Sequence, residues 1–333
     1  MYKTLLRPFL FLCDAERAHR LSLRALRGVG RVPGGRFMLR LFHKKNTPGL
    51  VREVFGISFP NPVGLAAGFD CNGEHLNLLS DLGFGFIEIG TLTTNAQGEK
   101  PKTVRLKKDK ALVDKRGHAN KGVRYAIEQL ASGRPQCPIC VNLGPGVDSE
   151  TAKQVATDYE TSFNVMYDFA DMFTILLPSL PDLSFSDIFD PILDLRLSYD
   201  CDKPVLVKIN SDIPYATLNS LLDYCMLSGI DGIIADGSTS DTSELLSKSR
   251  KIKSLDGGMV SGAPVFERTL TLVGHISEYT KGRLPIIGVG GITTPERAKE
   301  ILQAGASLIQ VYSGLAFEGP KLVKRILKYL ESK

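Results

Sequence analysis

Short apolar runs alternate with longer segments of helical spacing along the chain. Eight such runs occur, at residues 63–68, 86–91, 139–144, 172–177, 205–210, 232–237, 286–291 and 308–313. Runs that are apolar on both faces are typical of buried parallel strands, and most of these are separated by at least a helix length of chain. The pattern predicts an α/β fold in which eight parallel strands close into a (β/α)8 TIM barrel. A doubly wound open sheet is the alternative.

The last two runs end in residues with little or no side chain. Gly288, Gly290 and Gly291 end the seventh run, and Ser313 and Gly314 end the eighth. Glycine leaves backbone N–H groups unobstructed, and the loops after strands seven and eight of a barrel commonly bind phosphate. We therefore predict a site for a dianionic phosphate group. The alternative is a pair of buried strands followed by glycine turns.

Two connections are longer than a single helix requires, at residues 92–138 and 238–285. Insertions after barrel strands lie at the carboxyl end of the barrel, where active sites are found. We expect these two connections to cover or line the site.

The first 45 residues differ in charge from the rest of the chain. They contain eleven Lys or Arg against Asp14 and Glu16, so they carry +9, while the whole chain carries +5 and the remainder −4. The pattern predicts helices over 1–12, 14–27 and 37–43, the second capped by Asp14. We expect residues 1–45 to form a helical segment beside a barrel at 46–333. Apolar residues between the charges suit an anionic membrane surface better than nucleic acid.

Apolar segments and cysteines limit the class of protein further. No run reaches the roughly 18 apolar residues that a membrane span needs. Pro8 interrupts the apolar N-terminal stretch, and no small-residue cleavage site precedes Asp14, so a signal peptide is not expected. We expect a cytoplasmic protein held peripherally at the inner face of the cell membrane. Cys137 and Cys140 lack a second pair, so no metal site is predicted.

Five segments form a recognisable set: Ala15-Glu-Arg-Ala-His19, Asn61-Pro-Val-Gly-Leu-Ala-Ala-Gly-Phe-Asp70, Gly83-Phe-Gly-Phe-Ile-Glu-Ile-Gly-Thr91, residues 284–292 and residues 310–314. Together they resemble the membrane-associated, quinone-reducing class of dihydroorotate dehydrogenases of pyrimidine biosynthesis, over the whole chain. The resemblance implies FMN at the top of the barrel and oxidation of dihydroorotate, a small-molecule substrate. It also implies reoxidation by a membrane quinone that enters between the N-terminal helices.

The resemblance also implies which residues contact the cofactor and the quinone. Lys208 matches a lysine near the pyrimidine edge of the flavin, where a cation favours the negative charge gained on reduction. A lysine that reaches solvent from a strand end is the alternative. His19 and Arg105 match positions beside the quinone tunnel, with a solvent-facing histidine as the alternative for His19. The other FMN positions are Ala66, Ala67, Gly68, Thr91, Asn142, Gly262, Gly290, Gly291, Tyr312 and Ser313.

The substrate side departs from the family pattern at the catalytic base. The family's Asn-x-Ser-Ser-Pro-Asn, whose second serine takes the substrate proton, reads Thr174-Ile-Leu-Leu-Pro-Ser179 here. Leu177 therefore stands at the base position, and an aliphatic side chain cannot accept a proton. Ser179, His118 and Cys71 are the candidate substitutes.

Other substrate contacts of the family are replaced too. Cys71 takes the place of a lysine, while Thr174, Ser179 and Gly237 take the places of asparagines. The family's Asn-Arg-Met-Gly-Phe-Asn-Asn loop reads Asp114-Lys-Arg-Gly-His-Ala-Asn120. Each lost hydrogen bond to a polar ligand costs about 1–3 kcal/mol, and Asp114 would repel a carboxylate substrate.

Three functions follow from this combination. The first is an FMN oxidoreductase coupled to quinone that acts on dihydroorotate or on another small substrate. The second is a catalytically silent, flavin-binding paralogue with a binding or regulatory role at the membrane. The third, a phosphate-binding barrel that has lost flavin, is disfavoured by the intact flavin positions.

Overall fold

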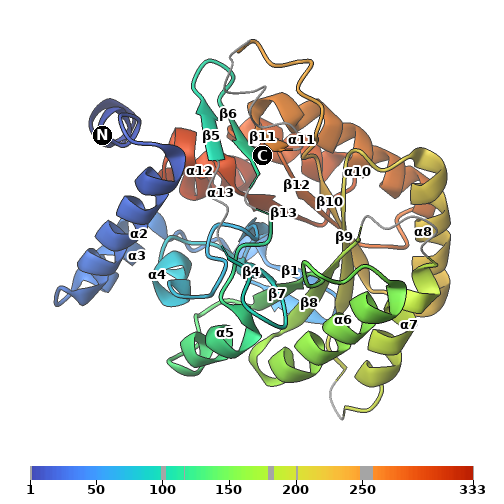
Figure 1. Cartoon of the computed structure of the whole chain (residues 1–333). Coiled ribbons are helices and arrows are strands. Elements are labelled where there is room, and N and C mark those ends of the chain that lie inside the picture. The colour runs from blue at the N-terminus through green and yellow to red at the C-terminus, as the bar shows by residue number, and fades with distance from the viewer. Residues whose placement is uncertain are drawn as a thin grey trace.

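A closed barrel of eight parallel strands forms the centre of the protein (Figure 1). The computed structural model describes residues 2–98, 103–115, 117–178, 184–199, 202–247 and 258–332. Each barrel strand pairs with the next one along the chain, and the last pairs with the first. The predicted TIM barrel is confirmed, and the open sheet is wrong. The strands are β3 (Val63–Leu65), β4 (Phe86–Leu92), β7 (Ile139–Leu143), β8 (Met172–Leu176), β9 (Val205–Asn210), β10 (Gly232–Asp236), β12 (Ile286–Val289) and β13 (Leu308–Val311).

Every barrel strand begins at the residue where its apolar run begins, and the ends differ by at most three residues. Alternate side chains of the strands fill the barrel interior, including Phe86, Leu206 and Leu308. A hairpin of β1 (Arg52–Val54) and β2 (Ile57–Phe59) adds Phe59 to this inner cluster. The barrel is therefore a packed core toward the amino ends of its strands. A binding site can form only at the carboxyl ends of the strands.

Helices surround the barrel and bury its outer face (Figure 1). The outer core contains the remaining strand side chains and the apolar faces of these helices. The helices are α4 (Leu76–Ser80), α5 (Gly122–Ala131), α6 (Ala152–Met166), α7 (Phe185–Arg196), α8 (Tyr215–Ser228), α10 (Phe266–Thr280), α11 (Pro295–Gln303), α12 (Ser313–Glu318) and α13 (Lys321–Glu331), with short helices η2 (Pro48–Leu50), η3 (Tyr167–Phe169) and η4 (Ala263–Val265).

The two long connections meet in a small antiparallel sheet. The first supplies β5 (Thr103–Leu106) and β6 (Ala111–Asp114), and the second supplies β11 (Met259–Gly262). Strand β6 lies between the other two. Because β6 and β11 pair at the carboxyl end of the barrel, they bring two distant segments to the mouth of the barrel.

The N-terminal segment forms helices that pack against the barrel. They are η1 (Tyr2–Leu6), a π-helix, followed by α1 (Arg7–Leu10), α2 (Ala15–Arg31) and α3 (Gly35–His43). Asp14 caps α2 as predicted, because its Oδ1 accepts a hydrogen bond of 2.7 Å from Arg17 N. The prediction of one helix over 1–12 is only partly right, since that stretch divides into η1 and α1. Among the described residues, no helix is both long enough and apolar enough to cross a membrane.

Arg105 of β5 joins the turn between α1 and α2 to the barrel. Its guanidinium donates hydrogen bonds to the carbonyls of Leu10 and Cys13 at 3.2–3.3 Å. It also lies 4.2 Å from the centre of the Phe11 ring. These contacts hold the N-terminal helices in place.

We expect Arg105→Ala to release the first helices while the barrel stays folded. Hydrogen bonds from a charged group contribute about 1.5–3 kcal/mol each, so limited proteolysis should cleave near residues 7–14 at least several-fold faster. Arg20→Ala, on an exposed position of α2, is the control and should leave cleavage unchanged. Equal cleavage of the two variants would contradict the role of Arg105.

Candidate functional site

A hollow opens at the carboxyl ends of the barrel strands, with about 1230 Å³ of space including open solvent at its mouth. Binding sites in this fold are found at this end. Ten of the eleven predicted FMN positions line it; for the eleventh, Gly262, the neighbouring Ser261 lies in the lining instead. The ten are Ala66, Ala67, Gly68, Thr91, Asn142, Lys208, Gly290, Gly291, Tyr312 and Ser313.

A second hollow adjoins the first on the side of β8 and β9. It is lined by residues of the loops after β7 and β8, including Pro145, Leu177 and Pro178. Residues shared by the two hollows mark the boundary between them. They are His118, Leu176, Lys208, Asp236, Ser238 and Met259.

Lys208 is buried in an ion pair that the sequence analysis did not predict. Its Nζ lies 3.0 Å from Oε2 of Glu88 on β4, and the side chains are 7% and 0% exposed. The same carboxylate oxygen accepts a hydrogen bond of 3.0 Å from Ala67 N. The alternative of a lysine that reaches solvent is therefore wrong. Glu88 follows inward-facing Phe86 by two residues, so a carboxylate at an inward position of an apolar strand was the signal available.

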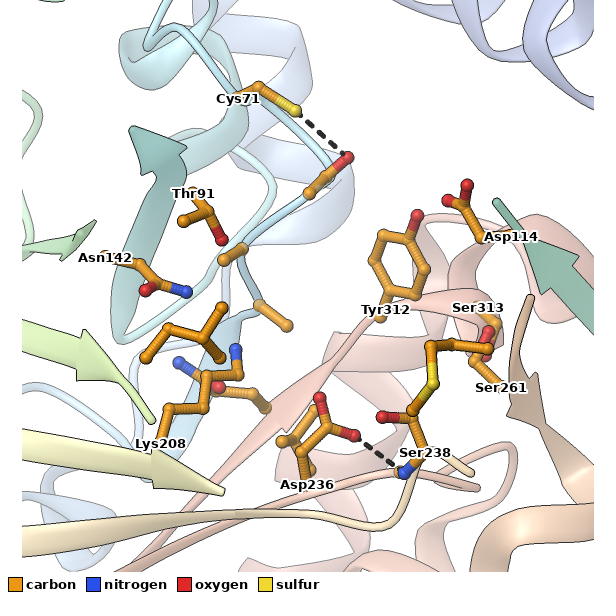
Figure 2. A pocket seen from close by; sticks show the side chains of 18 of the residues that line it. Cys71, Thr91, Asp114, Asn142, Lys208, Asp236, Ser238, Ser261, Tyr312 and Ser313 are labelled. Atoms are coloured by element: carbon orange, nitrogen blue, oxygen red, sulfur yellow. Dashed lines mark hydrogen bonds between the residues drawn. The ribbon is translucent and has the colours of Figure 1, made fainter. Parts of the chain in front are cut away.

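Asp236, at the end of β10, is the second acid that the sequence analysis missed. Its Oδ1 accepts a hydrogen bond of 2.8 Å from Ser238 N, as Figure 2 shows. It faces inward like Ile234 two residues before it, and it lines both hollows together with Lys208. Two carboxylates therefore share the neighbourhood of one ammonium group.

Burial and charge act in opposite directions on this cluster. Burial alone would lower the pKa of Lys208, but Glu88 and Asp236 raise it on balance, so the lysine stays charged. Burial raises the pKa of Asp236, although Lys208 and the Ser238 hydrogen bond oppose the rise. The sequence predicts that the positive charge of Lys208 stabilises a reduced flavin. Part of that charge is already neutralised by Glu88 and Asp236.

Several residues of the first hollow hold buried polar atoms without a hydrogen-bond partner among the described residues. They are Oδ1 of Asn142, Oγ of Ser261, and both Nε2 and Oε1 of Gln310. Buried polar groups in proteins are nearly always hydrogen-bonded. Unpaired amide and hydroxyl groups around one hollow suit a ligand with many donors and acceptors, and the ring, ribityl chain and phosphate of FMN have that character.

The two ends of this hollow differ in chemistry. Figure 2 shows Thr91, Asn142 and Lys208 on one side and Ser261 and Ser313 on the other. The amide and the charged pair suit the polar edge of a flavin ring, while the hydroxyl groups and nearby glycines suit a phosphate.

Gly290 and Gly291 are required by the packing of β12 against α10. Their φ angles are +132° and +67°. A Cβ at Gly290 would lie 2.3 Å from Oγ1 of Thr269, and one at Gly291 would lie 2.5 Å from Cα of Phe266. The chain can therefore turn here only with glycine, and the turn lines the hollow with bare backbone.

We expect Gly291→Ala to reduce the free energy of unfolding by about 1–3 kcal/mol, because a strained backbone and a clash with Phe266 are introduced. Gly274→Ala is the matched control, since a Cβ on that glycine of α10 meets nothing within 4 Å. It should stabilise the protein by up to about 1 kcal/mol. Denaturant unfolding measures both, and an equal response would contradict the packing account.

Comparison with known proteins decides the family. The family model for dihydroorotate dehydrogenase matches residues 49–333. The dihydroorotate dehydrogenase (quinone) of Christiangramia forsetii is 36% identical over 98% of this chain and 97% of the relative. That of Gloeobacter violaceus is 37% identical over 99% and 94%. The chain belongs to the dihydroorotate dehydrogenase family. The crystal structure of DHODH from Eimeria tenella with ferulenol agrees, with a TM-score of 0.81 and 25% identity over 95% of this chain and 90% of that chain.

The N-terminal helices of this family member are attached to the barrel near the first hollow. His19 of α2 lies with Nε2 2.8 Å from the carbonyl oxygen of Phe69 and its ring edge-on to the Phe69 ring. Phe69 directly follows Gly68 of the first hollow. The imidazole is half-buried rather than solvent-facing. His19 and Arg105 both lie between the helices and the barrel, which is where the family resemblance expects a quinone tunnel.

Residues predicted for the substrate side are only partly brought together. Cys71, Asp114 and His118 line the first hollow. The last two belong to the connection 92–138, and the connection 238–285 supplies Ser238, Met259 and Ser261, so both long connections line the hollow as predicted. Thr174 does not line either hollow, because its Oγ1 lies 3.0 Å from Cys140 Sγ inside the barrel. A role for Thr174 at the substrate side stays a prediction.

Gly237 also faces away from the site. A Cβ there would lie 1.9 Å from Oγ1 of Thr269 on α10, and its N–H donates to Val289 O at 2.8 Å. The neighbours Asp236 and Ser238 line the hollows instead, and a role for Gly237 at the substrate side stays a prediction. Ser179 lies outside the described residues.

Two leucines end β8 where this dihydroorotate dehydrogenase family carries two serines. Leu176 continues the inward alternation of Met172 and Thr174 and lines both hollows, whereas Leu177 lines only the second. The N–H of Leu177 donates to Lys208 O at 3.0 Å, which fixes the strand end. Neither position therefore carries a hydroxyl group that could accept a proton.

His118 is the titratable group best placed to replace the missing base. It lines both hollows, and burial lowers the pKa of its imidazole, so the neutral form that can accept a proton prevails at pH 7. Asn120 supports the loop, since its Nδ2 donates to His118 O at 2.6 Å and to Thr93 Oγ1 at 2.9 Å. Cys71 is a weaker candidate because its thiol contacts Gly68 O at 3.6 Å.

Proposed function

We propose that this protein is an FMN-dependent oxidoreductase that passes electrons to a membrane quinone. The observation that carries the proposal is the hollow at the barrel mouth, which brings together ten of the eleven predicted FMN positions. The relatives named dihydroorotate dehydrogenase (quinone) support both the flavin and the quinone. Bound FMN supplies two-electron redox chemistry.

The residues of the chain have separate tasks in this proposal. Gly290, Gly291 and Ser313 hold the phosphate, and Asn142 orients the ring by its amide. Lys208 adds a positive charge beside the ring, reduced in effect by Glu88. Packed leucines at the end of β8 exclude water from the boundary between the hollows.

Access to quinone rests on the N-terminal helices. Large apolar side chains of this segment are exposed, with Phe9 at 72% and Leu12 at 82%. The same segment carries a charge of +9. Apolar side chains beside many cations are typical of a helix that lies on an anionic membrane surface. We therefore infer peripheral attachment, which would place His19 and Arg105 close to the lipid.

The reaction with quinone tests the proposal. FMN-loaded protein is reduced by light under anaerobic conditions with EDTA as the electron donor, and decyl-ubiquinone is added in anionic vesicles. We expect the flavin absorbance to return within seconds with quinone and not without it. Arg105→Ala should slow the return several-fold, with Arg20→Ala as control. A return no faster with quinone than without would contradict the proposed acceptor.

A second candidate function is a catalytically silent flavin-binding protein at the membrane. Leu176 and Leu177, at positions where the family carries serines, favour it. A screen of dihydroorotate and related cyclic amides and acids under anaerobic conditions separates the two. Reduction of the flavin by any member supports an enzyme, and reduction by none supports the silent protein.

A further inference from the structure

The described lining of the two hollows is acidic. Asp114 and Asp236 face the space, and the one lysine of this lining, Lys208, is paired with Glu88 at 3.0 Å. Two carboxylates, Glu88 and Asp236, thus share one ammonium group. His118 adds no positive charge when neutral. A ligand on the substrate side therefore meets an excess of negative charge.

Asp236 is the acid that lies at the boundary where a substrate must sit. Ser238 donates to its carboxylate, through the backbone N–H at 2.8 Å and through the side-chain hydroxyl group. It is held on a rigid strand, because β10 pairs with β9 and β12 on both sides. A carboxylate has about four acceptor sites, so the donors of one serine leave acceptor capacity that a ligand N–H group can use.

Part of the second hollow that Asp236 lines is apolar. Leu176 ends β8, Leu177 follows it, and Pro178, Val155 and Ile209 continue this apolar surface. An apolar wall cannot hydrogen-bond a carboxylate group of a ligand. It can pack against the flat face of a ring.

We propose that the substrate side binds a ring that is neutral or cationic, with N–H donors directed at Asp236, and rejects a ring that carries a carboxylate. The proposal rests on the proposed function, because it names the substrate class of that same site. A ligand carboxylate beside Asp236 would lose its hydration. The described lining offers no free cation that could pair with it. Specificity by repulsion of the wrong ligand is a general device.

Three ligands that share one ring test the proposal: orotate, uracil and 6-(aminomethyl)uracil, which present a carboxylate, a hydrogen and an ammonium group at the same carbon. Calorimetry on the full-length protein as purified gives the three dissociation constants. We expect 6-(aminomethyl)uracil to bind most tightly and orotate most weakly, with roughly tenfold or more between them, since a charged hydrogen bond of about 1.5 kcal/mol corresponds to that ratio.

Asp236→Asn keeps the shape and removes the charge. The variant should raise the dissociation constant of 6-(aminomethyl)uracil roughly tenfold and change that of uracil by no more than a few-fold. Asp187→Asn, on an exposed position of α7, is the control and should change nothing. Orotate binding as tightly as 6-(aminomethyl)uracil, or binding of none of the three, would overturn the proposal. Calorimetry needs no flavin signal, and the flavin content is measured separately by absorbance. A failure of the flavin proposal can therefore be told apart from a failure of this proposal.

Discussion

Dihydroorotate is expected to reduce the flavin of this protein about 10²–10⁴ times more slowly than that of relatives with serine at the position of Leu177, because that is the usual contribution of a general base. Leu176 and Leu177 offer no proton acceptor at the end of β8. Anaerobic stopped-flow measurement of flavin bleaching gives the rate. The dihydroorotate dehydrogenase (quinone) of Gloeobacter violaceus, 37% identical, is a suitable reference.

Leu177→Ser alone should not restore the rate, because the change leaves Cys71, Ala119 and Asp114 at the substrate contacts of the family. Leu176→Ser is the matched control, since it adds the same hydroxyl one residue earlier. Full recovery by Leu177→Ser would show that the rest of the pocket still fits dihydroorotate. Fast bleaching of the unchanged protein would show that another group, with His118 first, takes the proton.

Glu88→Gln is expected to reduce the free energy of unfolding by about 3–5 kcal/mol, because it leaves a buried lysine without its partner. Lys208→Met should cost a similar amount by leaving Glu88 unpaired. The double variant should lose less than the sum of the two, since neither charge remains. Guanidinium unfolding of the four proteins gives the coupling between the side chains.

An exposed ion pair controls for this result. Arg268 and Asp241 lie 2.7 Å apart with side chains 30% and 43% exposed, and Asp241→Asn should reduce the free energy of unfolding far less than Glu88→Gln does. Because the pKa of Lys208 is raised on folding, its contribution is complete below about pH 10 and is lost only as the pH rises further. If Glu88→Gln reduced the free energy of unfolding no more than Asp241→Asn does, the claim that Glu88 and Lys208 form a stabilising buried pair would be contradicted.

The barrel could be predicted from the sequence because its strands are apolar on both faces and end at turns. The glycines that follow the seventh apolar run likewise indicated a turn at the hollow, since the backbone demands glycine at Gly290 and Gly291, and the phosphate site there stays a prediction. Local composition determines both features. The division of residues 2–10 into η1 and α1 was not predictable in this way, because it depends on packing against α12, where the Tyr2 hydroxyl donates to Ala316 O at 2.6 Å.

The polar interior was missed for a different reason. Glu88 and Asp236 belong to apolar runs, and only the closed barrel shows that both meet Lys208, Glu88 from across the interior and Asp236 from the neighbouring strand. Matching a motif gives the place of a residue in the chain but not the direction in which its side chain points. Thr174 and Gly237 therefore matched substrate positions while the neighbouring Leu176 and Asp236 face the space.

The flavin content of the purified protein tests the central claim most directly. Full-length protein is expressed, purified and incubated with FMN, and the absorbance of bound flavin is compared with the protein concentration. We predict yellow protein with stoichiometric FMN that is retained on gel filtration. Colourless protein that takes up no added FMN would contradict the claim that the barrel mouth is a flavin site.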